Sequence, residues 1–135
     1  MGIPLNTDST LKGQTIFLAE RAGELMVENI ITDRTVIDVM AFTQASKSIN
    51  YVDKEDFINH AKNLISEYDH IFYVSPEGVE IENNGVRETD AEYRDLIDFI
   101  IKNTINRYNH KIKNIHKISG STKERIKLIK QAISL

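Results

Sequence analysis

Residues 28–42 read ENIITDRTVIDVMAF and combine a short β-branched run, a charged pair and a dense apolar segment. The run at 29–32 is typical of a buried strand, because β-branched side chains fit a pleated surface. The apolar residues that follow are too closely spaced for a surface helix, so they predict a largely buried helix over 35–47. The sequence therefore predicts that Asp33 and Arg34 lie between the carboxyl end of a strand and a helix.

The rest of the chain alternates in the same way between helical and strand-like segments. Apolar residues at helical spacing predict four further helices, and two more short apolar runs predict strands. The helices are expected at 10–27, capped by Ser9 or Thr10, at 54–68, capped by Asp53, at about 90–108, capped by Asp90, and at 121–134; the strands are expected at 70–75 and 111–119. Strands that alternate with helices indicate an α/β fold in which helices cover a parallel sheet.

Composition indicates one soluble domain over residues 1–135. The chain is 41% hydrophobic and 27% charged, which is ordinary for a globular protein of this size. No apolar run approaches the roughly 20 residues that span a bilayer, and no leader is apparent, so we expect a cytoplasmic protein without membrane contact. The chain has no cysteine, which excludes disulfides and thiolate metal sites, and its four histidines lack metal-ligand spacing.

Charge is distributed unevenly along the chain. Residues 1–100 hold 8 basic and 19 acidic side chains, whereas residues 101–135 hold 9 basic and 1 acidic. A basic segment of this kind can contact phosphates or nucleic acid. The alternative is an ordinary solvated face whose lysine stems cover a helix.

The pair Asp33–Arg34 is the main candidate site. In open parallel sheets, ligands bind beyond the carboxyl ends of the strands, where loops and helix N-termini meet. A carboxylate there can hold a magnesium-bound water or accept a proton, and a guanidinium group can grip phosphate. The alternative is that Asp33 only caps the following helix.

Two later segments carry further candidates. Residues 76–89 lack periodicity and predict a long loop of the kind that forms lids or binding sites, and Arg87 lies on it. Arg94 follows in the next predicted helix, where a surface or ion-pairing role is the alternative. The segment SGST at 119–122 ends a predicted strand and opens a helix, which suits contact with an anion or a base, or simply forms a turn capped by Ser121.

Five segments, in this order, resemble the P-loop nucleoside and nucleotide kinase superfamily. The likeness is closest to AAA-type ATPase and kinase-like domains related to the nicotinamide riboside kinase domain. The segments are DSTLKGQTIFLAERAGE, IITDRTVIDVMAF, YDHIFYVSPEG, NNGVRETDAEYRDLIDF and ISGSTKERIKLI. The resemblance implies a three-layer parallel fold, ATP and Mg²⁺ as cofactors, and phosphoryl transfer to a nucleoside, a nucleotide or another small molecule.

The same resemblance implies roles for individual residues. Asp33 would match the carboxylate near magnesium and substrate, Arg34 the phosphate- or substrate-directed arginine, and Arg87 the lid arginine. Arg94 would be a second arginine near the cofactor.

It also implies that Ser119 and Gly120 lie beside the nucleotide base. Gln14, in the first predicted helix, and Asp38, in the helix after the charged pair, would face the substrate.

One family feature is missing from the sequence, the phosphate loop GxxxxGK[ST]. In these folds the strand before that loop lies between the strands expected at 29–32 and 70–75, so both would keep an unpaired edge. We expect an upstream segment, a second chain or direct pairing of the two strands to fill the gap.

Three hypotheses about function follow. The chain is the C-terminal part of an ATP-dependent kinase or ATPase and is inactive alone, or it is a non-catalytic binding or regulatory module that forms homo-oligomers. A third hypothesis is a kinase that acts on DNA.

Overall fold

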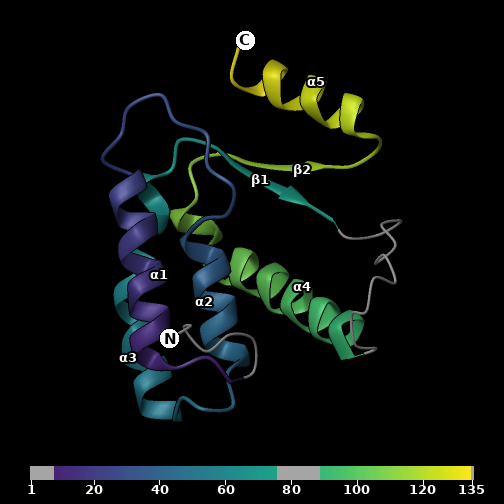
Figure 1. Cartoon of the computed structure of the whole chain (residues 1–135). Coiled ribbons are helices and arrows are strands. Elements are labelled where there is room, and N and C mark those ends of the chain that lie inside the picture. Colours follow the sequence, from purple (N-terminus) through teal and green to yellow (C-terminus); the bar gives the residue numbers. More distant parts are fainter. Residues whose placement is uncertain (1–7, 76–88, 135) are drawn as a thin grey trace.

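The computed structural model describes residues 8–75 and 89–134 of the chain (Figure 1). The predicted loop at 76–89 therefore lies almost entirely outside the described residues. The elements in order are α1 (Leu11–Glu24), α2 (Val36–Ala45), α3 (Tyr51–Ala61), the 3-10 helix η2 (Lys62–Glu67), β1 (Ile71–Val74), α4 (Thr89–Arg107), the 3-10 turn η3 (Asn109–Lys111), β2 (Ile115–Ile118) and α5 (Thr122–Ala132). No helix within the described residues is long and apolar enough to cross a membrane.

Helix α2 forms the centre of the hydrophobic core. It contacts α1, α3 and α4, and Figure 1 shows it between α1 and α4. Its buried residues are Val36, Ile37, Val39, Met40, Ala41 and Thr43. The prediction of a largely buried helix after the charged pair is therefore confirmed, because a helix surrounded by three others has almost no polar face.

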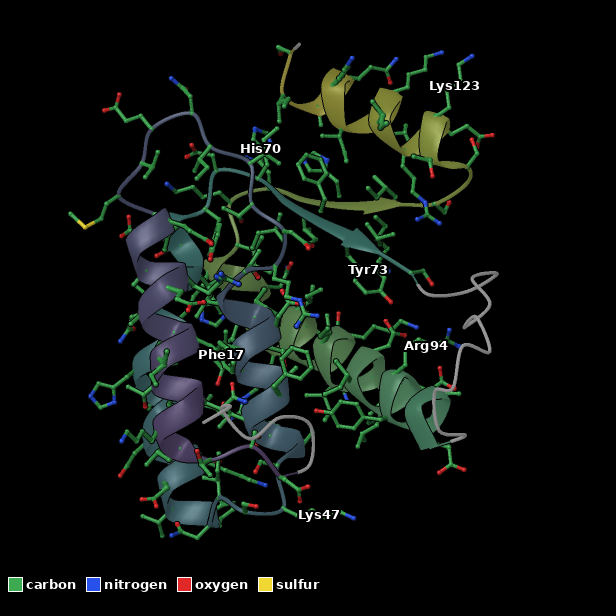
Figure 2. The ribbon with its side chains drawn as sticks, in the orientation of Figure 1. Phe17, Lys47, His70, Tyr73, Arg94 and Lys123 are labelled. Carbon is green, nitrogen blue, oxygen red and sulfur yellow. The ribbon has the colours of Figure 1, made fainter. Side chains whose placement is uncertain are left out.

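The strands β1 and β2 form a two-stranded parallel sheet. Ile71 pairs with Ile115, and both side chains pack against the core. The Tyr73 hydroxyl donates a hydrogen bond to Asp98 of α4, and Figure 2 shows the Tyr73 side chain directed from β1 toward that helix. The parallel pairing of β1 and β2 confirms the prediction of an α/β fold with a parallel sheet. The three-layer arrangement stays a proposal.

Helix α5 lies on the other side of the two strands from α1–α4 in Figure 1. It packs against β2, but none of its own residues is buried in the described structure. Ile118 of β2 is buried, whereas Ile126 of α5 is 48% exposed. The last helix is therefore attached to the sheet much more loosely than α2 is attached to its neighbours.

The predicted strand at 29–32 is wrong. Asn29 lies in a turn with a φ of 55°, and residues 30–32 have no regular secondary structure. The side chains of Ile30 and Ile31 are 45% and 69% exposed. Within the described residues β1 and β2 pair only with each other. Direct pairing of 29–32 with 70–75, one of the three alternatives for filling the gap in the sheet, is therefore wrong as well. A β-branched run becomes a strand only when a partner strand lies beside it.

Helix caps were predicted with mixed success. Thr10 caps α1 and Ser121 caps α5, as predicted, each through a hydrogen bond from a backbone N–H to the side chain. The cap predicted at Asp53 is wrong, because Asn50 caps α3 and accepts from the N–H of Asp53. Asp53 instead lies in the first turn of α3, where its negative charge interacts favourably with the positive end of the helix dipole.

Candidate functional site

The turn of residues 32–35 positions Asp33 and Arg34 directly before α2. Both side chains are exposed, and Arg34 has a φ of 83°, in a region that residues other than glycine rarely adopt. The Thr32 hydroxyl donates to the Arg34 carbonyl oxygen at 2.9 Å and helps to hold this conformation. A backbone conformation of this kind costs energy, so it persists only where the surrounding structure stabilises it. Such conformations are frequent at functional sites.

The first turn of α2 is anchored by other parts of the chain. Thr35 Oγ1 accepts from the N–H of Ile37 at 3.1 Å, and Asp38 Oδ2 accepts from the N–H of Thr35 at 2.7 Å, which together form a capping box. Tyr68, which follows η2, accepts from the N–H of Val36 at 3.0 Å. The N–H of Asp38 bonds to the Thr35 carbonyl oxygen at 3.1 Å, so these amides are already satisfied and a ligand would have to be bound by side chains.

The electrostatics of Asp38 reflect its place in this cap. Burial raises the pKa of Asp38 above its usual range, while the Thr35 hydrogen bond and the positive charge of Arg34 lower it. The negative charge of Asp33 also raises the pKa of Asp38. The structure thus brings Asp33, Arg34 and Asp38 together, but Asp38 caps the helix and its carboxylate is committed to Thr35.

The Arg34 side chain rests on an aromatic surface shared by two helices. Its guanidinium carbon lies 5.1 Å from the centre of the Phe42 ring, within the range of a cation–π contact. The Phe42 ring stacks on Tyr93 of α4 with centroids 6.5 Å apart. Burial raises the pKa of Tyr93, and the charge of Arg34 opposes that shift. Arg34, Phe42 and Tyr93 therefore form one cluster, which we call the arginine–aromatic cluster.

Sequence reasoning missed this cluster. Phe42 lies in the apolar stretch that predicted the buried helix, and Tyr93 lies in the helix predicted over about 90–108. Helical spacing could not relate Arg34 to either ring, because Arg34 precedes α2 and has a left-handed backbone conformation.

The other candidate residues lie in different surroundings. Gln14 is 3% exposed, and its Oε1 has no hydrogen-bond partner within the described residues, so it lies inside the protein and not on an open surface. Arg94 of α4 forms an ion pair with Asp95 at 3.5 Å, consistent with the alternative of an ion-pairing role (Figure 2). Arg87 lies outside the described residues.

The turn at Ser119 and Gly120 connects β2 to α5. Gly120 has a φ of 99°, a backbone conformation that residues with a Cβ atom rarely adopt, so this position favours glycine. The Arg125 Nε donates to the Gly120 carbonyl oxygen at 2.9 Å, and Ser121 accepts from the N–H of Glu124 at 3.2 Å. These contacts all lie within the turn, which agrees with the alternative that residues 119–122 simply form a turn capped by Ser121.

A family model for an AAA domain matches residues 10–125 of the chain. The chain belongs to the AAA domain family. No curated protein and no solved structure gives a significant match. AAA domains are P-loop nucleotide-binding domains, and the α/β model with its small parallel sheet agrees with that assignment.

Nucleotide binding in this family usually involves Mg²⁺, so the residues can be tested for a fit. Within the described residues no group of three His, Asp or Glu side chains could hold a metal ion alone. Asp33 is an exposed single carboxylate, which suits Mg²⁺ because this ion keeps most of its waters and is held largely by substrate phosphates. The AAA domain can therefore contribute one ligand or one water contact at this turn.

Proposed function

We propose that this AAA domain takes part in ATP-dependent phosphoryl transfer, as a kinase or an ATPase, and that the chain alone is inactive. The phosphoryl acceptor would be a nucleoside, a nucleotide or another small metabolite, with a base in DNA as a further alternative. The observation that carries the proposal is the anchored turn at Asp33 and Arg34, which presents a carboxylate beside a guanidinium group at the start of a buried helix.

Each candidate residue receives a role in this proposal. Asp33 would orient a magnesium-bound water and Arg34 would bind phosphate oxygens, because a guanidinium fork matches their geometry. Arg87 would close on the phosphates as a lid arginine, with Arg94 near the cofactor.

Ser119 and Gly120 would lie beside the base. For Gln14 the burial of its side chain argues against direct substrate contact, and Asp38 would act on substrate only through the position of the turn.

The proposal requires phosphate-binding groups beyond this sequence, because no GxxxxGK[ST] motif occurs in the 135 residues. A segment or a second chain that carries this motif would supply them, on a strand that would pair with the second edge of β1.

A binding module that forms homo-oligomers is the second candidate. It is favoured by four exposed apolar side chains in the segment after α1, those of Met26, Val27, Ile30 and Ile31, because exposed apolar surface can mark an interface. Light scattering on the purified chain separates the candidates, since a module of this kind should be a dimer or larger, and a monomer would count against it.

Calorimetric titration with ATP tests the main proposal. Because the chain lacks the phosphate loop, we expect only weak, magnesium-dependent binding through the turn at Asp33 and Arg34. It should weaken about tenfold further in Arg34→Ala, because a charge-assisted contact is lost. Asp33→Asn should reduce the dependence on magnesium, and the control Lys123→Ala, on exposed α5, should bind like the unchanged chain. Equal ATP affinity in the unchanged chain and Arg34→Ala would overturn the proposed role of this turn.

A further inference from the structure

A cavity of about 310 Å³ lies between α2, α3 and α4. This volume is at the lower end of the range of small-molecule sites in proteins, roughly 300–1,000 Å³. Its lining includes apolar side chains from all three helices, Met40, Ile58 and Ile100, and a polar group formed by Gln44, Asn103 and Arg107. None of these residues belongs to the candidate nucleotide site.

The floor of the cavity is apolar. Met40 and Ile58 are almost fully buried, so their side chains form a fixed surface. Thr104 also lines the cavity, but its hydroxyl donates to the Ile100 carbonyl oxygen of its own helix at 2.7 Å. The polar atom of Thr104 is therefore satisfied, and the floor offers mainly hydrophobic contact to a ligand.

The polar side of the cavity carries positive charge. The Arg107 guanidinium carbon lies 5.5 Å from the centre of the Tyr108 ring, and Arg107 has no ion pair with an acidic side chain within the described residues. Arg107 is therefore the charged side chain among the described residues that line the cavity. Among the described residues that line it, none is acidic.

We propose that this cavity binds a small organic acid with a flat apolar body. The apolar part would contact Met40 and Ile58, and the acidic group, a carboxylate or a similar anion, would pair with Arg107. The amides of Asn103 and Gln44 would bond to the polar edge of the ligand, since side-chain amides both donate and accept. Tyr108 and Arg107 supply the aromatic and cationic surfaces that favour a planar ligand.

The test is a titration of the chain with 2-naphthoate and, separately, with the uncharged 2-naphthamide, followed by NMR of labelled isoleucine methyl groups. We expect the methyl signals of Ile58 and Ile100 to shift, while Ile30 and Ile126, which are exposed elsewhere, stay in place. The acid should bind about tenfold more tightly than the amide, because only the acid forms a charge-assisted contact.

Two variants at exposed positions test the contacts without disturbing the core. Arg107→Gln should weaken 2-naphthoate binding about tenfold and leave the amide nearly unaffected. Asn103→Phe should fill the opening and weaken binding of both compounds, and Lys123→Gln on α5 should change neither. The proposal is overturned if Ile58 and Ile100 do not shift at millimolar probe, or if Arg107→Gln binds the acid as well as the unchanged chain does.

Discussion

The turns before α2 and α5 begin from similar sequence signals and end in different structures. Each follows an apolar run and each starts a helix with a hydroxyl cap, Thr35 in one and Ser121 in the other. The turn before α2 is tied to distant parts of the chain, most directly by the hydrogen bond between Tyr68 and Val36. The hydrogen bonds described for the turn before α5 lie within residues 120–125.

This difference teaches that a local signal for a strand end and a helix start does not by itself make a binding site. The Arg34 side chain lies against the buried helix α2. Its guanidinium group contacts the ring of Phe42, which stacks on Tyr93. Gly120 has no comparable support, since α5 has no buried residue in the described structure.

Matched isoleucine substitutions in the two helices should give the largest difference. Ile37 of α2 is 2% exposed and Ile126 of α5 is 48% exposed. Ile37→Ala should lower the free energy of unfolding by about 2–5 kcal/mol, because it leaves a cavity in the core. Ile126→Ala should cost less than about 1 kcal/mol. Urea unfolding measures both, and equal losses would contradict the contrast between the helices.

Removal of one hydroxyl should weaken the anchor of the α2 turn. Tyr68→Phe leaves the buried N–H of Val36 without its partner, which should lower the free energy of unfolding by about 1–3 kcal/mol. Tyr51→Phe is the matched control, because Tyr51 is 75% exposed and should lose almost nothing. If the two variants unfold at the same urea concentration, the hydrogen bond to Tyr68 does not stabilise the turn.

The cap of α2 should make stability depend on pH. Because burial raises the pKa of Asp38 above its ordinary value of 3.8, the folded protein keeps this proton at a pH where the unfolded chain has lost it. The free energy of unfolding should therefore fall as pH rises from 3.8 through the raised pKa, and this contribution should stay constant above it.

Asp38→Asn isolates this effect, because asparagine keeps an oxygen that can accept from Thr35. The stability of the unchanged chain relative to Asp38→Asn should decline as pH rises through this range, while Asp38→Ala should lose about 1 kcal/mol through loss of the cap. Urea unfolding of all three proteins across the acidic range gives the result. A relative stability that increases with pH would show that the cap favours the charged form.

Substitutions at two positions with positive φ, Arg34 and Gly120, should give the smallest effects, with opposite signs. Arg34→Gly should be more stable than Arg34→Ala by about 0.5–1 kcal/mol, because glycine adopts the φ of 83° without strain. Gly120→Ala should be less stable than the unchanged chain by about 1 kcal/mol for the converse reason. Thermal unfolding of the four proteins tests this pair, and a gain in stability from Gly120→Ala would contradict it.

Much of the fold could be predicted from the sequence because its signals are local. The dense apolar residues after Arg34 predicted the buried helix α2, and the runs around Ile71 and Ile115 predicted the two strands. The caps at Thr10 and Ser121 followed from residue type alone.

The rest depended on partners that a local pattern does not contain. The run at 29–32 has the composition of a strand, but strand formation needs a paired neighbour, and this run pairs with neither strand of the described sheet. The sequence alone suggested Asp33 and Arg34 as a pair. It did not suggest the hydrogen bond from the N–H of Val36 to Tyr68, because these two residues are more than 30 positions apart. Gln14 was expected on an open face and lies inside, because α1 packs against α2.

The most direct test of the account is an amide NMR titration of the chain with magnesium pyrophosphate, which carries phosphates and no base. The account predicts shifts for the backbone amides of residues 33–37 that are strongly reduced in Arg34→Ala, and no comparable shifts for residues 120–124. Shifts confined to residues 120–124, or shifts at 33–37 that persist unchanged in Arg34→Ala, would contradict the claim that the turn before α2 is the phosphate-binding turn.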